Sequence, residues 1–302
     1  MSHRPSVEVL PRLFVAGQGR DCPQRDWHPL ARLDPGDRGL AYGDGVFETL
    51  RFAEGVPVWW DRHIDRLERG AERLAIAAPD RTWLRRQVDA LIADVAVGVV
   101  KIILTRGVGG RGYRPPMAAE PVLVLSCHPL PEPPPRAGLR LRWCRLRLAA
   151  QPALAGIKHL NRLEQVLARS EWDDPDIHEG LLCDGTGAVV SAISGNLFMR
   201  RAGRWLTPAI RDCGIEGVGR AWLLDTLPVE IADLRPSEVE TADALFVCNS
   251  VRGILPVAAL AERQWRPDPE IMALRRRLAQ DWPAFAADLA ADPAFDLQPD
   301  SL

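Results

Sequence analysis

A proline-rich segment near the middle of the chain limits the folds that are open to it. Residues 129–138, PLPEPPPRAG, hold five prolines in ten positions. Proline has a fixed φ and no amide hydrogen, so this run excludes a helix or a central strand and favours an extended connector. We therefore predict two domains, a smaller N-terminal one over residues 1–128 and a larger one over residues 139–302.

The bulk composition is that of a globular protein with a sizeable core. The 302 residues are 47% hydrophobic and 26% charged, which suits two modest domains. No stretch approaches the ~20 apolar residues of a membrane span, and the N-terminus holds no signal-peptide run. The formal charge is −2, and the arginines are interleaved with acidic residues, so neither nucleic acid nor a membrane is expected as a partner. We expect a cytoplasmic protein.

Apolar runs predict strands on both sides of the connector. They lie at residues 7–15, 46–52, 98–105, 121–127 and 139–148. Turn residues predict β-hairpins around Asp184-Gly185 and Ala202-Gly203.

Helical spacing predicts three helices among these strands. One carries Ile64, Leu67, Ala71 and Leu74 on one face, with Asp61 as its cap, and a second covers residues 82–95. A third is expected over residues 161–172, with its inward face formed by Leu163, Val166, Leu167 and Ser170. Strands and helices mix without a strict βαβ rhythm, so the predicted fold class is α+β, with mixed α/β content.

A glycine-rich run follows the strand at 98–105. Residues 107–112, GVGGRG, match the dinucleotide motif G-x-G-x-x-G, but the prolines at 115 and 116 prevent the helix that such a site needs. What remains is a flexible loop with Arg111 and Tyr113, suited to closing over an anionic substrate.

Metal and disulfide chemistry have no signature in this chain. The histidines are isolated, no metal-ligand spacing or G-x-S-x-G motif occurs, and we predict no metal site. The six cysteines lack a C-x-x-C pair and are expected to be reduced thiols.

Lysine use singles out two positions. Of 38 basic residues, only Lys101 and Lys158 are lysines. Arginine stays protonated, whereas lysine can lose its proton and form a Schiff base. A lysine that survives among arginines is therefore a candidate for amine chemistry, although survival by chance is an equal alternative. Lys158 precedes a predicted helix, while Lys101 lies mid-strand, where a snorkelling edge lysine is the simpler reading.

A second glycine turn complements Lys158. Residues 214–220, GIEGVGR, lead into the helical sequence AWLLDTL. Free backbone N–H groups at a helix N-terminus suit a phosphate ester.

Five motifs resemble those of the fold-type IV pyridoxal 5′-phosphate (PLP) enzymes, in that family's order and spacing. They are LAYGDGVFETLRF, RHIDRL, LAGIKHLNRLEQVLARS, EGLLCDGTGAVVSAISGNLF and CGIEGVGR. The lysine motif and RGVGGRGY are especially similar to those of aminodeoxychorismate lyases. The resemblance implies a two-domain fold like that of D-amino-acid aminotransferase and conversion of 4-amino-4-deoxychorismate to 4-aminobenzoate and pyruvate, a step toward folate. It also implies a homodimer, with Tyr42 near the subunit boundary.

The resemblance assigns roles to individual residues. Lys158 matches the lysine that binds the cofactor covalently and shuttles the proton, and Arg66 matches the phosphate-binding arginine. The phosphate positions are Val218 and Gly219, where the family often has threonine at the second, and Ser250 falls where a hydroxyl often stands near the phosphate. Arg111 and Tyr113 match loop positions that hold a substrate carboxylate, and Lys101 is a further candidate anchor.

One position departs from the family pattern. Five residues before the Asn of NLF, most members have an acidic residue that pairs with the cofactor's ring nitrogen, and here the residue is Ser191. A hydroxyl carries no negative charge and should weaken the electron sink. Aromatisation of the product supplies driving force of its own, which favours the lyase over a branched-chain or D-amino-acid aminotransferase. A binding module without turnover is a further alternative.

Overall fold

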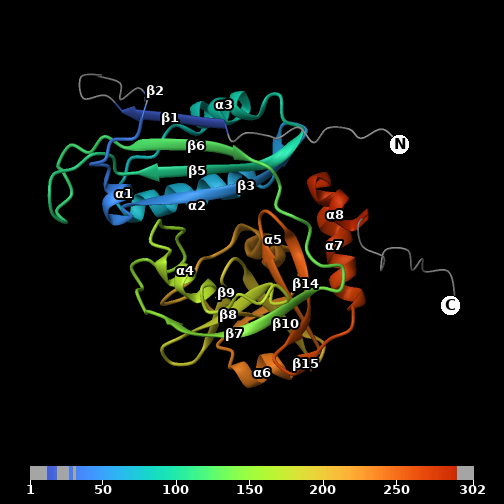
Figure 1. Ribbon diagram of the computed structural model, residues 1–302. Coiled ribbons are helices and arrows are strands. Elements are labelled where there is room, and N and C mark those ends of the chain that lie inside the picture. The colour runs from blue at the N-terminus through green and yellow to red at the C-terminus, as the bar shows by residue number, and fades with distance from the viewer. Residues whose placement is uncertain (1–11, 19–26, 30–31, 291–302) are drawn as a thin grey trace. The chain divides into compact units, whose positions relative to one another are not determined.

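The protein divides into two compact units, residues 1–131 and residues 132–302 (Figure 1). The computed structural model describes residues 12–18, 27–29 and 32–290. The division between the units falls within the proline-rich segment 129–138.

The first unit is built on a six-stranded antiparallel sheet in the order β2-β1-β6-β5-β3-β4. Its strands are β1 (Arg12–Gln18), β2 (Trp27–Pro29), β3 (Gly45–Ala53), β4 (Val56–Pro57), β5 (Val97–Thr105) and β6 (Val122–His128). The strands predicted at 46–52, 98–105 and 121–127 are confirmed. The strand predicted at 7–15 overlaps β1, and residues 7–11 lie outside the described part of the chain.

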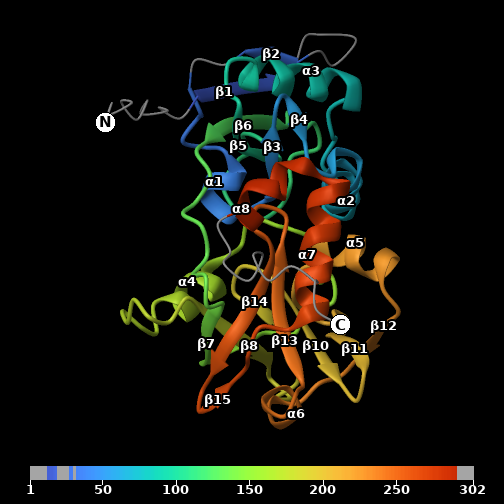
Figure 2. The same cartoon turned by 90° about the vertical axis from the view of Figure 1, so that its right-hand side faces the viewer.

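Helices cover one face of this sheet and enclose the core with it (Figures 1 and 2). They are α2 (Trp60–Arg73) and α3 (Arg81–Ile92), while α1 (Arg38–Tyr42) is a single short turn before β3. Ile64, Leu67 and Ala71 are buried as their spacing predicts. The predicted cap Asp61 is wrong: α2 begins at Trp60, two residues before the start that a cap at Asp61 implies, and its cap is Trp59 in a left-handed conformation with φ 53°. Asp61 instead lies in the first turn, where its charge favours the helix dipole.

The second unit contains a nine-stranded mixed sheet, ordered β12-β11-β10-β13-β14-β7-β8-β9 with β15 paired to β14. Its strands are β7 (Leu139–Leu148), β8 (Glu179–Asp184), β9 (Val189–Ala192), β10 (Asn196–Arg201), β11 (Arg204–Pro208), β12 (Val229–Ala232), β13 (Ala244–Asn249), β14 (Gly253–Leu260) and β15 (Arg263–Gln264). Both predicted hairpins are confirmed, β8 with β9 and β10 with β11. Ala202 and Gly203 have positive φ of 49° and 74°, as a tight two-residue hairpin requires.

Five short or medium helices complete this unit. They are α4 (Leu163–Arg169), α5 (Val218–Thr226), α6 (Pro236–Glu240), α7 (Pro269–Asp281) and α8 (Ala286–Ala290), with a 3₁₀ turn at Pro283–Phe285. Among the described helices none has both the length and the apolar character that crossing a membrane requires.

The predicted orientation of α4 is wrong. Leu163, Val166 and Leu167 are 68%, 57% and 54% exposed, and within the helix only Ala168 is buried. The helix is also shorter than the predicted range 161–172. A leucine-rich helical spacing indicates an apolar face, but it does not say whether this chain or another body covers that face.

The cysteines that the structure describes are free thiols, as the sequence analysis predicts. Cys127, Cys144, Cys183, Cys213 and Cys248 are free thiols, and all but Cys213 are buried. No group of three or more potential metal ligands occurs among the described residues.

Candidate functional site

Two segments far apart in sequence meet at Lys158. Gly156 and Ile215 form a parallel β-bridge. The Gly156 amide donates to the Gly214 carbonyl at 3.0 Å, and the Glu216 amide donates to the Gly156 carbonyl at 3.1 Å. Lys158, which is half-buried, is therefore two residues along the chain from Gly156, the residue that contacts the glycine turn. The structure brings together the two weak sequence signals that were expected to serve one cofactor.

Asn196 at the start of β10 holds this turn in place. Its Nδ2 donates to the Ile215 carbonyl at 3.0 Å, and its Oδ1 accepts from the Gly217 amide at 3.1 Å. A Cβ on Gly217 would lie 2.1 Å from Oδ1, so the close approach requires glycine. Asn196 pairs in the sheet with Cys248, which brings the end of β13, two residues before Ser250, to the same place.

The N-terminus of α5 offers backbone donors for an anion. Gly217 is its cap and makes no side-chain hydrogen bond, so the cap residue leaves the first amides of the helix, among them those of Val218 and Gly219, available to a ligand. Arg220 is only 6% exposed, and its Nη2 donates to the Pro208 carbonyl at 3.2 Å. Its buried Nε has no hydrogen-bond partner among the described residues, and burial lowers the Arg220 pKa. These groups fit the phosphate of a PLP cofactor beside its lysine.

Ser191 lies on β9 and is 9% exposed. On the paired strand β8, the carboxylate of Glu179 accepts from the amides of Gly180 and Ser194 at 3.0 and 3.2 Å and from the Ser194 hydroxyl. Ser191 pairs with Leu182, and side chains alternate along a strand, so Glu179 faces the opposite side of the sheet. Glu179 therefore does not supply the carboxylate that Ser191 replaces.

His159 and Arg162 form a half-buried pair beside Lys158 that the sequence analysis missed. Arg162 donates to Nε2 of His159, while Nδ1 of His159 and Nε of Arg162 are buried without a partner among the described residues. Burial lowers the His159 pKa to about 4 and the Arg162 pKa to about 10. His159 is therefore neutral at physiological pH. Both residues lie in the lysine motif LAGIKHLNRLEQVLARS, so their closeness to Lys158 in the sequence was the signal that could have identified them.

Arg66 is fixed by a buried carboxylate in the first unit. Its Nε and Nη2 donate to Glu48 at 2.8 and 2.6 Å, and His63 Nδ1 lies 2.6 Å from the same carboxylate. Burial alone would raise the Glu48 pKa, but Arg66 and His63 lower it to about 2. The bidentate pair sets the orientation of the guanidinium, so Arg66 is a buried, oriented cation rather than a solvated helix charge. Glu48 was not predicted, although it lies in the motif LAYGDGVFETLRF.

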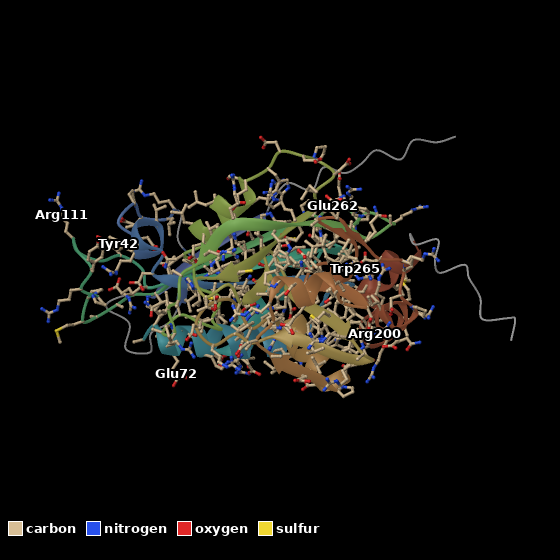
Figure 3. The ribbon with its side chains drawn as sticks, turned by 90° about the horizontal axis from the view of Figure 1, so that it is seen from below. Tyr42, Glu72, Arg111, Arg200, Glu262 and Trp265 are labelled. Atoms are coloured by element: carbon tan, nitrogen blue, oxygen red, sulfur yellow. The ribbon has the colours of Figure 1, made fainter. Side chains whose placement is uncertain are left out.

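Arg111 and Tyr113 lie on the loop between β5 and β6, and both side chains are exposed. Figure 3 shows the Arg111 side chain pointing outward from this loop. The ring of Tyr113 is 5.5 Å from that of Tyr42 in an edge-on arrangement. No helix follows the glycines, as the proline pair predicts, so a dinucleotide site is excluded.

Lys101 lies at the centre of β5, opposite Thr49 of β3 and Ser126 of β6. Its side chain is half-buried, and its Nζ is 5.5 Å from the centroid of the Phe47 ring. It thus stands on the sheet face opposite the helix-covered core formed by Val100 and Ile102.

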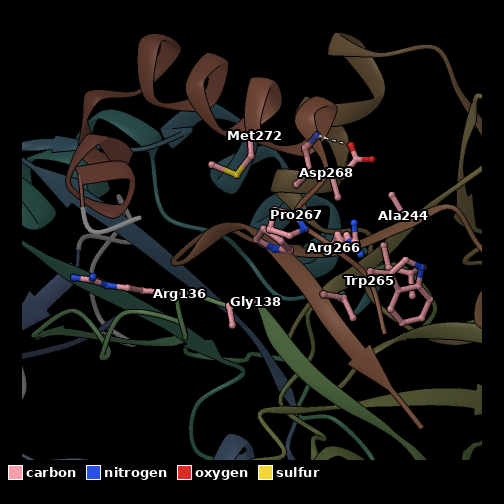
Figure 4. Close-up of a pocket in the computed structure, with 13 residues that line it drawn as sticks. Arg136, Gly138, Ala244, Trp265, Arg266, Pro267, Asp268 and Met272 are labelled. Atoms are coloured by element: carbon pink, nitrogen blue, oxygen red, sulfur yellow. Dashed lines mark hydrogen bonds between the residues drawn. The ribbon is translucent and has the colours of Figure 1, made fainter. Parts of the chain in front are cut away.

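A pocket in the second unit is lined by none of the candidate site residues (Figure 4). It lies between the proline-rich segment, β14 and the start of α7. Asp268 at its edge caps α7 through the amides of Glu270 and Ile271. No candidate site residue lines it, so we assign it no part in the function.

Comparison with known proteins places the chain in a class of enzymes. Residues 45–260 match the profile of the class IV aminotransferases, described as "Amino-transferase class IV". The chain belongs to this family.

Individual relatives point to a subgroup. An aminodeoxychorismate lyase of Vibrio harveyi is 34% identical over 83% of this chain and 95% of its own length. The crystal structure of the 4-amino-4-deoxychorismate lyase from Pseudomonas aeruginosa is similar to this chain at 47% identity with a TM-score of 0.80, covering 84% of this chain and 97% of that one. A putative branched-chain-amino-acid aminotransferase of Methanocaldococcus jannaschii is 29% identical over 75% of this chain and 82% of its own length.

Proposed function

We propose that this protein is a PLP-dependent 4-amino-4-deoxychorismate lyase that forms 4-aminobenzoate and pyruvate. The observation that carries the proposal is the joining of the Lys158 segment to the glycine turn at the N-terminus of α5 through the Gly156–Ile215 bridge. Lyases of this name that are 34% and 47% identical to the chain support this specific reaction.

The candidate site residues take distinct roles in this proposal. Lys158 would hold PLP covalently at its aldehyde carbon, and its free amine would move the proton from the substrate carbon that bears nitrogen. The amides of Val218 and Gly219 hold the phosphate, with Ser250 near it. Arg66 is the proposed phosphate-binding arginine of the first unit, oriented by Glu48. When bound, PLP supplies an electron sink for the charge that develops on the substrate.

The substrate binds through its two carboxylates. Arg111 and Tyr113 are the proposed anchors on the loop, with Lys101 as a further candidate. The two products together contain all the atoms of the substrate, so the reaction needs neither water nor an amino acceptor. Proton return from Lys158 to the departing enolpyruvyl group completes the elimination. Ser191 makes a weaker partner for the cofactor's ring nitrogen than a carboxylate, which an aromatising elimination tolerates better than transamination does.

The exposed apolar face of α4 supports a homodimer. Leu163, Val166 and Leu167 lie within ten residues of Lys158 in the sequence and are more than half exposed in the single chain. A contiguous apolar patch of this kind is typical of a subunit interface.

We place the protein in the cytoplasm, in folate synthesis.

The alternative within the family is an aminotransferase for branched-chain or D-amino acids, which the Methanocaldococcus jannaschii relative supports. The test is incubation of the purified holoprotein with chorismate, glutamine and an aminodeoxychorismate-forming synthase. A lyase releases 4-aminobenzoate and pyruvate without a 2-oxo acid, whereas amine exchange that depends on a 2-oxo acid would overturn the proposal. No turnover in either assay would favour a binding module.

The two lysines allow a direct test of the cofactor lysine. Borohydride reduction of the holoprotein should fix the phosphopyridoxyl group on the peptide that contains Lys158 and leave Lys101 unmodified. The variant Lys158→Ala should lose turnover while keeping its fold, and Lys101→Ala serves as the matched lysine variant for cofactor attachment. Modification of Lys101 alone would refute the assignment of Lys158.

A further inference from the structure

The loop that carries Arg111 and Tyr113 has little stiffness of its own. Four of the seven residues from 107 to 113 are glycine, and Tyr113 is 85% exposed. A free loop of this composition would lose much conformational entropy on binding a substrate. We call residues 107–113 the 107–113 loop.

A buried arginine, Arg38, binds the backbone at the C-terminal end of the 107–113 loop. Arg38 of α1 is 4% exposed. Its Nη1 donates to the Gly112 carbonyl at 3.0 Å and its Nη2 to the Tyr113 carbonyl at 2.9 Å. Its Nε donates to Asp44 at 2.8 Å, so all three nitrogens of the guanidinium are engaged. A lysine could not make this set of contacts, because an ammonium lacks the planar fork.

Other contacts from α1 act on the same loop. The Arg38 amide donates to the Gly107 carbonyl at 2.9 Å at the near end of the loop. The Gly112 amide donates to the Tyr42 hydroxyl at 3.3 Å, and the Arg38 guanidinium lies 4.8 Å from the Tyr42 ring centroid. A Cβ on Gly109 would lie 2.5 Å from Cδ of Arg38, so the loop wraps closely around this side chain.

Asp44 fixes Arg38 and ties it to the end of α2. Its carboxylate also accepts from Arg106 Nε and Nη2 at 2.8 and 3.0 Å. Arg106 in turn donates to the carbonyls of Leu74 and Ala75, which follow α2. Burial would raise the Asp44 pKa, but the two arginines lower it, so Asp44 stays charged at neutral pH. The arginine that binds the loop is thus part of a charged cluster formed by Arg38, Asp44 and Arg106.

We propose that Arg38 is a positioning residue that holds the 107–113 loop in the conformation in which Arg111 and Tyr113 bind the carboxylates of the substrate. The role of those two side chains rests on the proposed function. Arg38 itself contacts the loop backbone, and it acts on the substrate only through the loop.

The test compares Arg38→Lys with Arg69→Lys, an exposed arginine of the same unit. For Arg38→Lys, KM for aminodeoxychorismate should rise about ten- to hundredfold, the effect of losing charged hydrogen bonds, while kcat changes little. Cofactor absorption should be unchanged. Tyr42→Phe removes only the hydroxyl and should raise KM by a smaller factor, which also serves if Arg38→Lys fails to fold.

A second readout does not depend on activity. Trypsin should cut the Arg111–Gly112 bond several times faster in Arg38→Lys than in the wild type or Arg69→Lys, because cleavage follows local opening of the loop. Cleavage at the wild-type rate, or faster cleavage with an unchanged KM, would overturn the proposal. If the wild type releases no 4-aminobenzoate, the lyase assignment fails, and the cleavage rates still decide whether Arg38 holds the loop.

Discussion

The charge of Glu48 should contribute strongly to the stability of the first unit, and Glu48→Gln removes it. The carboxylate is fully buried and bound to Arg66 and His63. Glutamine keeps the size of the side chain but directs an amide group toward the guanidinium. Arg66, which is only 5% exposed, then loses the carboxylate that balances its charge.

The expected loss is large. Breaking a buried ion pair by removing one partner costs about 3–5 kcal/mol, against a typical total stability of about 5–15 kcal/mol. The matched control is Glu68→Gln on α2, the helix that carries Arg66. Glu68 pairs with Arg81, which is 45% exposed, so its loss should cost less than about 1 kcal/mol.

Urea unfolding at neutral and acidic pH measures both effects. The Glu48 pKa falls from 4.5 to about 2 on folding, so the unfolded chain takes up a proton first as the pH drops. The stabilisation from Glu48 is therefore complete above pH 4.5 and is lost as the pH falls toward about 2. Glu48→Gln should flatten this part of the profile. A loss below about 1 kcal/mol with an unchanged acid profile would refute the reasoning.

Three further predictions concern the second unit. Gly217→Ala should weaken PLP binding roughly tenfold in absorbance titrations while the fold persists, because its Cβ would displace Asn196; unchanged affinity would contradict this. His159→Gln should remove a stability decrease that the wild type shows as the pH falls from 6.5 to about 4, where charging His159 opposes folding; urea midpoints that fall equally in both proteins would exclude it. Leu167→Glu should convert a dimer to a folded monomer in sedimentation experiments, and a dimer that persists would show that the interface lies elsewhere.

Much of the fold follows from local sequence patterns. The alternation in β7 and the spacing of Ile64, Leu67 and Ala71 report which residues share a face, and backbone geometry converts that pattern into a strand or a helix. The Ala202-Gly203 turn was likewise readable, because few residues adopt the positive φ that both of its positions have, and the Asp184-Gly185 turn was readable from its turn-forming residue types. The family motifs carried the candidate lysine and the phosphate turn for the same reason: each is a local signal.

Only the tertiary structure decided which of these signals meet. The Gly156–Ile215 bridge joins segments whose contact depends on the whole sheet of the second unit, and the pairing of Arg66 with Glu48 depends on how α2 packs on β3. The exposure of Leu167 on α4 was equally out of reach, since an apolar spacing defines a face but not its neighbour. Sequence periodicity determines which face of its own helix or strand a side chain occupies. Long-range packing determines which other residues that side chain contacts.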